Sequence, residues 1–238
     1  MKHVEMAVSN QCHYLAMKMM IKNDDSIENI NEKFIDSLEL GYVEVAKLFI
    51  SIGADIHTHN NAAIIWSSSK GDLHMVQLLI DLGANVTAQE NLPIAFAASR
   101  GYYSVVKLLI ENGATIKDPY DGAIDSAARN GHYSIVKLLI DYGANVKNNR
   151  ALISASLKGH ISIVKLLIDS GANIHCMKID DVLQCGQMEV VYLLIEKGAD
   201  ITANNNQALI LLLEIGDLSL AKLLINRGPI FSPRIIGQ

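Results

Sequence analysis

The chain has 238 residues, of which 50% are hydrophobic, and a formal net charge of −5. Its most apolar run, residues 208–213, is only six residues long before Glu214 interrupts it, whereas about 20 apolar residues are needed to span a bilayer. The start of the chain lacks the apolar core of a secretory signal. The composition therefore predicts one elongated, soluble domain with no membrane association.

The cysteines point to a reducing compartment. Cys12, Cys176 and Cys185 are odd in number and lack the CxxC spacing of metal and redox sites. They are predicted to be small buried apolar residues. A cytoplasmic or other intracellular location is the matching expectation.

Residues 1–31 are predicted to form an N-terminal helical cap or half-repeat, because they lack the sequence motif that recurs later in the chain. Apolar residues in this segment follow a helical spacing of three and four residues, at Val4, Val8, Cys12, Leu15 and Met19. The sequence NDDS at 23–26 then predicts a break and a new N-cap, before another helical stripe starts at Ile27. The ends of repeat arrays are commonly atypical because they have a neighbour on one side only.

The rest of the chain is built from one recurring sequence motif. Its copy at 131–146 reads GHYSIVKLLIDYGANV, and the opening glycines of the copies lie at 41, 71, 101, 131, 159, 186 and 216. The steps between them are 30, 30, 30, 28, 27 and 30 residues. Repetition at this period predicts an array of structural repeats.

Each copy of the motif predicts a short amphipathic helix. In the copy at 131–146, Ile135, Val136 and Leu139 share one face, and Lys137 falls on the solvent side. Ser134 is expected to serve the free backbone N–H groups of the first turn, and Gly143 to end the helix in a left-handed conformation. A helix of about ten residues is not stable alone in water. The copies must therefore stack to form a core.

A shorter apolar stretch precedes each opening glycine, for example LPIAFAASRG from Leu92. The two stretches together resemble the ankyrin-repeat family, whose unit of about 33 residues reads TPLHxAAxxGHxxVVxLLLxxGAxxN. Leu92 to Ala95 stand at the TPLH positions, and His132 and His160 complete the Gly-His pair. The resemblance covers residues 32–228 and implies an all-α, ankyrin-type solenoid of about seven helix-pair repeats.

This sequence departs from the family pattern between repeats. The threonine and histidine of TPLH are absent, and only 9 residues separate Gly83 from Leu92 and 6 separate Gly171 from Met177. The resemblance therefore implies shortened hairpin loops, with 175–185 the least regular junction. The short, Asn- and Ile-rich repeats also resemble the ankyrin proteins of giant DNA viruses, which implies a viral protein acting on a host factor in the host cell.

The last repeat, 207–228, has an unusually apolar first helix, ALILLLEI, where an end cap should be polar on its outer face. The tail, 229–238, contains Pro229 and Pro233 and is not expected to continue a helix. Two alternatives stay open: the tail covers the apolar end, or the end meets another protein.

No catalytic constellation is present, so the chain is predicted not to be an enzyme and to need no cofactor or metal. His57 and His59 lack a third ligand of matching spacing. Asp180 and Asp181 are adjacent and would point apart on a helix. The sequence has no nucleotide-binding or hydrolase motif.

The resemblance implies that the two residues before each opening glycine face the concave surface and contact the partner. Cations recur there in four successive repeats, and two aromatic residues stand shortly before them in the second and third. The predicted partner-binding residues are Lys70, Arg100, Arg129, Lys158, Ser69, Ser99, Asn130, Trp66 and Phe96. Charges about 10 Å apart, near the Debye length, would add to one local field. The alternatives are that the cations only solubilise the surface and that the two aromatics fill the core.

The predicted function is a non-catalytic protein–protein interaction scaffold that acts as a monomer and binds an acidic partner protein, with no small-molecule substrate. Nucleic-acid or phosphate binding through the same cations is an alternative, opposed by the net charge of −5 and by the absence of a groove-reading motif. Structural self-assembly through the apolar C-terminal end is a third possibility.

Overall fold

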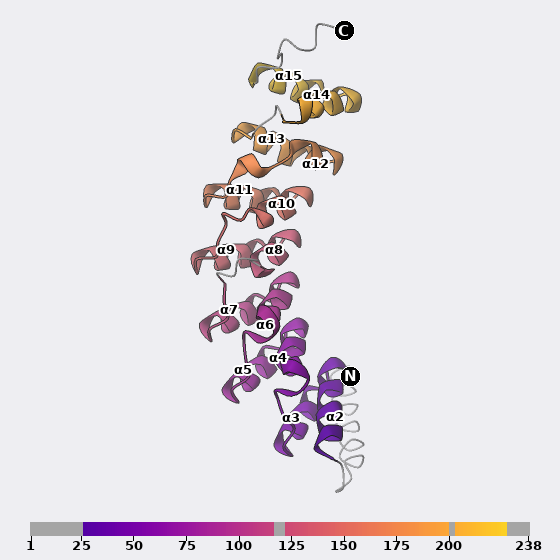
Figure 1. Cartoon of the computed structure of the whole chain (residues 1–238), viewed down its shortest axis with the longest axis vertical. Helices are drawn as coiled ribbons and strands as arrows, with labels where there is room; N and C mark the ends of the chain where they lie inside the picture. Colours follow the sequence, from indigo (N-terminus) through magenta and orange to yellow (C-terminus); the bar gives the residue numbers. More distant parts are fainter. Residues whose placement is uncertain (1–25, 117–121, 200–202, 228–238) are drawn as a thin grey trace, which may run out of the picture. The chain divides into compact units, whose positions relative to one another are not determined.

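The computed structural model describes residues 26–116, 122–199 and 203–227, and the regular elements of these residues are all helices (Figure 1). Fourteen α-helices occur in the described residues as seven consecutive pairs, with no strand among them. None of these helices is long and apolar enough to cross a membrane. The all-α fold of about seven helix pairs is therefore confirmed.

The chain divides into two compact units, with the boundary in the sequence after Thr115. In the first unit the first helices of the pairs lie side by side, α2 against α4 and α4 against α6, and each first helix contacts the second helix of its pair. The helices are α2 (Ile27–Glu39), α3 (Val43–Ser51), α4 (Thr58–Lys70), α5 (Leu73–Asp81), α6 (Ala88–Ser99) and α7 (Tyr103–Glu111).

The second unit repeats this arrangement. α10 contacts α8 and α12, and α11 contacts α9 and α13. Its helices are α8 (Gly122–Arg129), α9 (Tyr133–Asp141), α10 (Arg150–Leu157), α11 (Ile161–Asp169), α12 (Ile179–Gln184), α13 (Met188–Glu196), α14 (Ala203–Ile215) and α15 (Leu218–Arg227), with a 3₁₀ turn at Ile174–Cys176.

The second helix of each pair follows the predicted amphipathic pattern. In α9, Val136 and Leu139 are fully buried, whereas Lys137 is exposed. Gly143 has φ of 88°, as expected for the residue that ends the helix. Burial against neighbouring pairs stabilises helices that are too short to persist alone.

The start of these helices differs from the prediction. α9 begins at Tyr133 after the N-cap residue His132, which makes no side-chain capping bond, so Ser134 lies inside the first turn and the predicted capping role is wrong. The capping place is the residue that follows the opening glycine. Where an aspartate stands there, it caps: Asp72 accepts a hydrogen bond from the Met75 amide at 3.0 Å.

Asparagines hold the shortened connections in place of the missing threonine and histidine. Asn85, in the GAN sequence, accepts a hydrogen bond from the amide of Thr87, which closes a turn within its own loop. Other asparagines connect successive loops: the side-chain oxygen of Asn91 accepts from the Thr115 amide at 3.1 Å, and that of Asn149 from the Asn173 amide at 2.8 Å. Each loop is thus fastened to the next across 24 residues.

Gly71 and Gly83 allow a matched test of how the pairs stack. Both have positive φ, but a Cβ on Gly83 would meet open space, whereas one on Gly71 would lie 2.6 Å from the ring of Tyr102 in the next pair. We expect Gly83→Ala to cost about 1–2 kcal/mol of unfolding free energy, from backbone strain alone, and Gly71→Ala to cost more because the Tyr102 ring must also move. Urea denaturation of both variants measures the difference, and equal losses would contradict close packing of Tyr102 on Gly71.

Among the junctions that the structure describes in full, the one at 175–185 is the least regular, as predicted. A 3₁₀ turn replaces the usual loop there, and α12 has 6 residues, against 9 in α7. The boundary predicted between 31 and 32 falls inside α2, which begins at Ile27 after an N-cap at Ser26. Residues 1–25, which include Cys12, and the tail from 228 lie outside the described residues.

Short helices with irregular flanks open at lower free energy than regular ones. We expect the amides of Val182 and Leu183 in α12 to exchange with solvent about tenfold or more faster than those of Leu108 and Leu109 in α7. Native-state hydrogen exchange followed by NMR or mass spectrometry measures the ratio. Equal protection of the two helices would show that the junction is not a weak point.

Candidate partner-binding surface

The ends of α4 and α6, in the first unit, bring aromatic and cationic side chains together. Lys70 is the last residue of α4 and is exposed, and Trp66 lies one turn earlier and is half-buried. The Lys70 Nζ lies 5.9 Å from the centre of the Trp66 ring, within the range of a cation–π interaction. Lysine and indole therefore form one surface feature.

Arg100 connects the ends of the two helices. It is the C-cap residue of α6, and its guanidinium donates a hydrogen bond to the backbone carbonyl oxygen of Ser69 in α4. The last carbonyls of a helix lack intrahelical partners and carry partial negative charge. The contact therefore satisfies an acceptor of α4 and draws the charge of Arg100 towards the end of α4, where Lys70 stands.

One alternative predicts that Phe96 fills the core, but the residue is exposed. Its side chain is 39% exposed, one turn before Arg100, in the place that Trp66 occupies in α4. By contrast, Ile64 of α4 and Ile94 of α6 are buried. For the half-buried Trp66, both a packing and a contact role remain compatible with its position.

The two serines of the predicted set are less available than the cations. Ser69 is 4% exposed and its hydroxyl donates to the Trp66 carbonyl oxygen, so its side chain offers little surface to a partner. The reason is that Ser69 lies one residue before Lys70, which rotates it by about 100° around the helix into the interior. Ser99 stands in the same place of α6 and is half-buried.

In the second unit Arg129 is paired with an acid. Its guanidinium lies 3.2 Å from the carboxylate of the buried Asp125, and this carboxylate also accepts a hydrogen bond from Ser154. Arg129 stands two residues before Gly131, in the place of Ser69 rather than of Lys70. Arg129 is therefore one residue out of register with Lys70, whose place is taken here by Asn130, and its contact with a partner stays a prediction.

Lys158 and Asn130 keep the predicted place directly before the opening glycine. Both are exposed, and the side-chain amide of Asn130 donates to the Ser126 carbonyl oxygen at 2.8 Å. Lys158 is the C-cap residue of α10. Because Lys70 and Arg100 belong to one unit and these residues to the other, the continuous row across both units stays a prediction.

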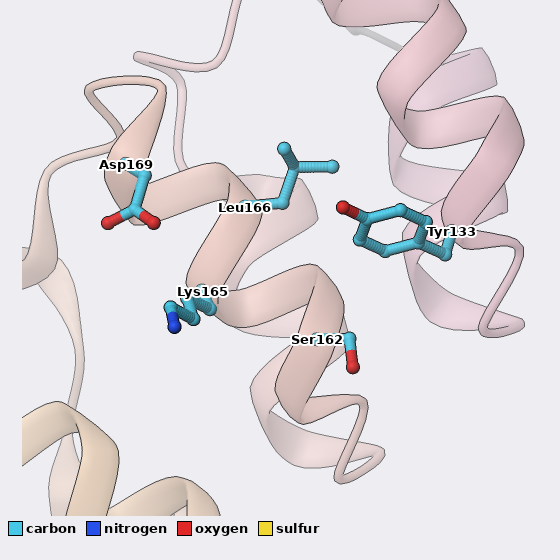
Figure 2. A pocket seen from close by; sticks show the side chains of 5 residues that line it. All are labelled: Tyr133, Ser162, Lys165, Leu166 and Asp169. Carbon is cyan, nitrogen blue, oxygen red and sulfur yellow. The ribbon is translucent and has the colours of Figure 1, made fainter.

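A surface depression of about 470 Å³ lies among second helices of the second unit (Figure 2). Tyr133 of α9 extends towards Leu166 of α11, and Ser162, Lys165 and Asp169 of α11 complete the lining. Its polar residues are exposed, and Asp169 is paired with Lys197 at 2.9 Å. No residue of the predicted partner-binding set lines it.

The described residues contain no group of three or more potential metal ligands. His57 Nδ1 lies 2.8 Å from the side-chain oxygen of Asn61, and Asp180 is buried whereas its neighbour Asp181 is exposed. Burial raises the pKa of the Cys176 thiol, partly offset by a backbone hydrogen bond, which disfavours the nucleophilic thiolate.

The sequence carries a further signal of this surface. Trp66 and Lys70, and likewise Phe96 and Arg100, are four residues apart, the spacing that places side chains on one helix face. A separate signal, the recurrence of Asn31, Asn61 and Asn91 every 30 residues, marks the hydrogen bonds of Asn31 and Asn91 between repeats. The contact between Arg100 and Ser69 has no such signal, because it depends on how the helices stack.

Comparison with known proteins identifies the repeat type. A family model described as "Ankyrin repeats (3 copies)" matches residues 34–120 and 121–178. The crystal structure of the human ASB11 ankyrin repeat domain superposes with a TM-score of 0.68 at 21% sequence identity, covering 82% of this chain and 97% of that one. A search of the curated proteins gave no match.

Proposed function

Because the chain belongs to the ankyrin-repeat family, we propose that it is a non-catalytic scaffold that binds an acidic partner protein through the exposed ends of its first helices. Ankyrin repeats are in general protein-interaction modules, and the repeat fold offers an extended surface for such contacts. The proposal here concerns which surface is used and what it recognises.

The observation that carries this proposal is the cluster of Trp66, Lys70, Phe96 and Arg100, which we call the aromatic–cationic patch. Its two cations are exposed on a chain with net charge −5, so they form a local exception to the overall charge. Aromatic residues and arginine are the side chains that contribute most to protein interfaces. Lysine and arginine select carboxylate or phosphate groups on the partner.

The resemblance to the ankyrin proteins of giant DNA viruses leads us to propose a host protein as the partner. An intracellular host factor with an acidic surface segment fits both this origin and the charge of the patch. The same capture experiment that tests the binding surface tests this proposal, because the lysate is prepared from host cells and the captured proteins are identified.

Affinity capture from a host-cell lysate tests the patch. Wild-type protein and the variant Lys70→Glu/Arg100→Glu are immobilised at equal density, and the captured proteins are quantified by mass spectrometry. We expect the reversal to remove the specific partners. Thermal unfolding of the variant is measured alongside, because Arg100→Glu also removes the hydrogen bond to the Ser69 carbonyl oxygen, and capture is compared at a temperature at which both proteins are folded.

The matched control reverses Lys107 and Lys137, exposed residues of the second helices α7 and α9. We expect this variant, with the same change in net charge, to retain the partners. If the partners survive reversal of the patch, or are lost only with the second-helix lysines, the binding surface lies elsewhere.

A further inference from the structure

Two parallel stripes of accessible side chains cross the first unit. On α4 the stripe is Ala62, Trp66 and Lys70, and on α6 it is Leu92, Phe96 and Arg100, with each residue exposed or half-buried. The spacing of four residues keeps the members of a stripe on one helix face. Both stripes therefore present, in the same order, an apolar, an aromatic and a cationic side chain.

The distance between the stripes follows from helix packing. α4 and α6 are in contact, and the axes of packed helices lie about 8–10 Å apart. Trp66 and Phe96 occupy equivalent places, so two aromatic side chains recur at about this spacing. A partner segment that contacts both rings must present equivalent groups on one face every 8–10 Å.

Polyproline II conformation meets this requirement. It repeats every three residues and about 9.3 Å, whereas same-face residues of a β-strand recur about every 6.7 Å. In an α-helix, same-face residues three or four positions apart lie only about 5–6 Å from each other, and a spacing near 10.5 Å needs seven residues. Polyproline II needs only four residues, Pro-x-x-Pro, to cover both rings, and its preformed chain loses little entropy when it binds aromatic surfaces.

The extent of the patch also favours a short segment. On α2, the helix on the other side of α4, the places equivalent to Ala62 and Trp66 hold Glu32 and Asp36, both exposed. These carboxylates would repel an acidic segment that continued over α2. Within the first unit, the contact surface is therefore about two helices wide, which suits a few residues of extended chain better than the length of a helix.

The cations define what the segment carries between its prolines. Lys70 and Arg100 lie one turn beyond the rings of Trp66 and Phe96, so they meet one edge of a chain that crosses both rings. In polyproline II every third residue faces such an edge. Arg100 is held by the Ser69 carbonyl and keeps further N–H donors for a carboxylate.

We infer that the aromatic–cationic patch binds a proline-rich segment in polyproline II conformation, with an acidic residue at every third position. Prolines pack on Trp66 and Phe96, and the carboxylates bind Lys70 and Arg100. This inference rests on the proposed function, because it specifies the chemistry of the segment that the patch recognises.

Fluorescence anisotropy with three labelled peptides tests the inference. The probe is fluorescein-PPEPPEPPE-NH2, the first control is fluorescein-PPPPPPEEE-NH2, with the same composition but without the three-residue spacing of the glutamates, and the second is fluorescein-PPKPPKPPK-NH2. We expect the probe to bind at least about tenfold more tightly than either control, because only it matches both rings and both cations. Equal affinity for the two glutamate peptides would overturn the inference.

Variants of the full chain locate the binding site. Phe96→Ala and Trp66→Ala are each expected to weaken probe binding by about tenfold or more, and Trp66→Phe to restore most of it. Tyr103→Ala is the matched control, because Tyr103 is 43% exposed in α7, the other helix of the same pair. Circular dichroism and thermal unfolding confirm that each variant is folded, and an unchanged affinity in both alanine variants would overturn the inference.

The outcomes separate this inference from the proposed function. If Lys70→Glu/Arg100→Glu loses its captured partners but the wild type does not bind the probe, the proposed function stands and the polyproline segment is wrong. Tighter binding of a helical peptide with glutamates seven residues apart would also overturn the polyproline assignment. If the reversal changes neither the captured partners nor the binding of the probe, the aromatic–cationic patch is not a binding site.

Discussion

Replacing Leu139 with alanine is expected to lower the free energy of unfolding by about 2–5 kcal/mol. Leu139 is fully buried in α9, which packs against α8 within its pair and against α11 of the next pair. Truncation removes apolar contacts on both sides and leaves a cavity that rigid neighbouring helices fill poorly. Urea denaturation followed by circular dichroism measures the loss.

Lys137→Ala provides the control on the same helix. Lys137 is exposed two residues before Leu139, and alanine is a good helix former, so the expected change is within about 0.5 kcal/mol. A loss for Leu139→Ala as small as that of Lys137→Ala would mean that the stacked pairs do not hold α9 in place.

The helix pairs were predictable because each repeat has the same spacing of apolar residues, lysine and glycine. The burial of Val136 and Leu139, the exposure of Lys137 and the left-handed Gly143 follow from spacing within one segment. The helix start was mispredicted at Ser134. Serine is a favourable N-cap, but it can cap a helix only from the residue directly before the first turn. A shift of two residues moved it from the cap into the helix.

The candidate surface was predictable only in part. The exposure of Lys70 and Arg100 follows from their repeated place before a glycine, but their contacts join residues that are distant in sequence: Arg100 and Ser69 are 31 residues apart. The same holds for Asp125, whose carboxylate joins Arg129 of its own helix to Ser154 of the next pair. Such contacts depend on helix stacking and rotamers, which no local pattern specifies.

Reversal of the first-unit cations is expected to slow association with the captured partner far more than changes in the second unit. For Lys70→Glu/Arg100→Glu we expect the association rate constant at 50 mM salt to fall by about tenfold or more, because the reversed field repels acidic groups. For Arg129→Gln/Lys158→Glu we expect less than about a threefold change, because Asp125 already offsets the charge of Arg129 and no aromatic residue occupies the places of Trp66 and Phe96 there. Biolayer interferometry at 50 and 300 mM salt measures both variants.

Salt and the choice of substitution make this comparison decisive. Screening shortens the Debye length at the higher salt, so the rates of wild type and the Lys70→Glu/Arg100→Glu variant should converge there if the effect is electrostatic steering. Glutamine rather than glutamate is used at Arg129, because a second acid beside the buried Asp125 would destabilise α8 and confuse binding with folding. Equal slowing by both variants would favour a row of cations along both units over the aromatic–cationic patch, and a difference between variants that persists at 300 mM salt would indicate direct contacts instead of steering.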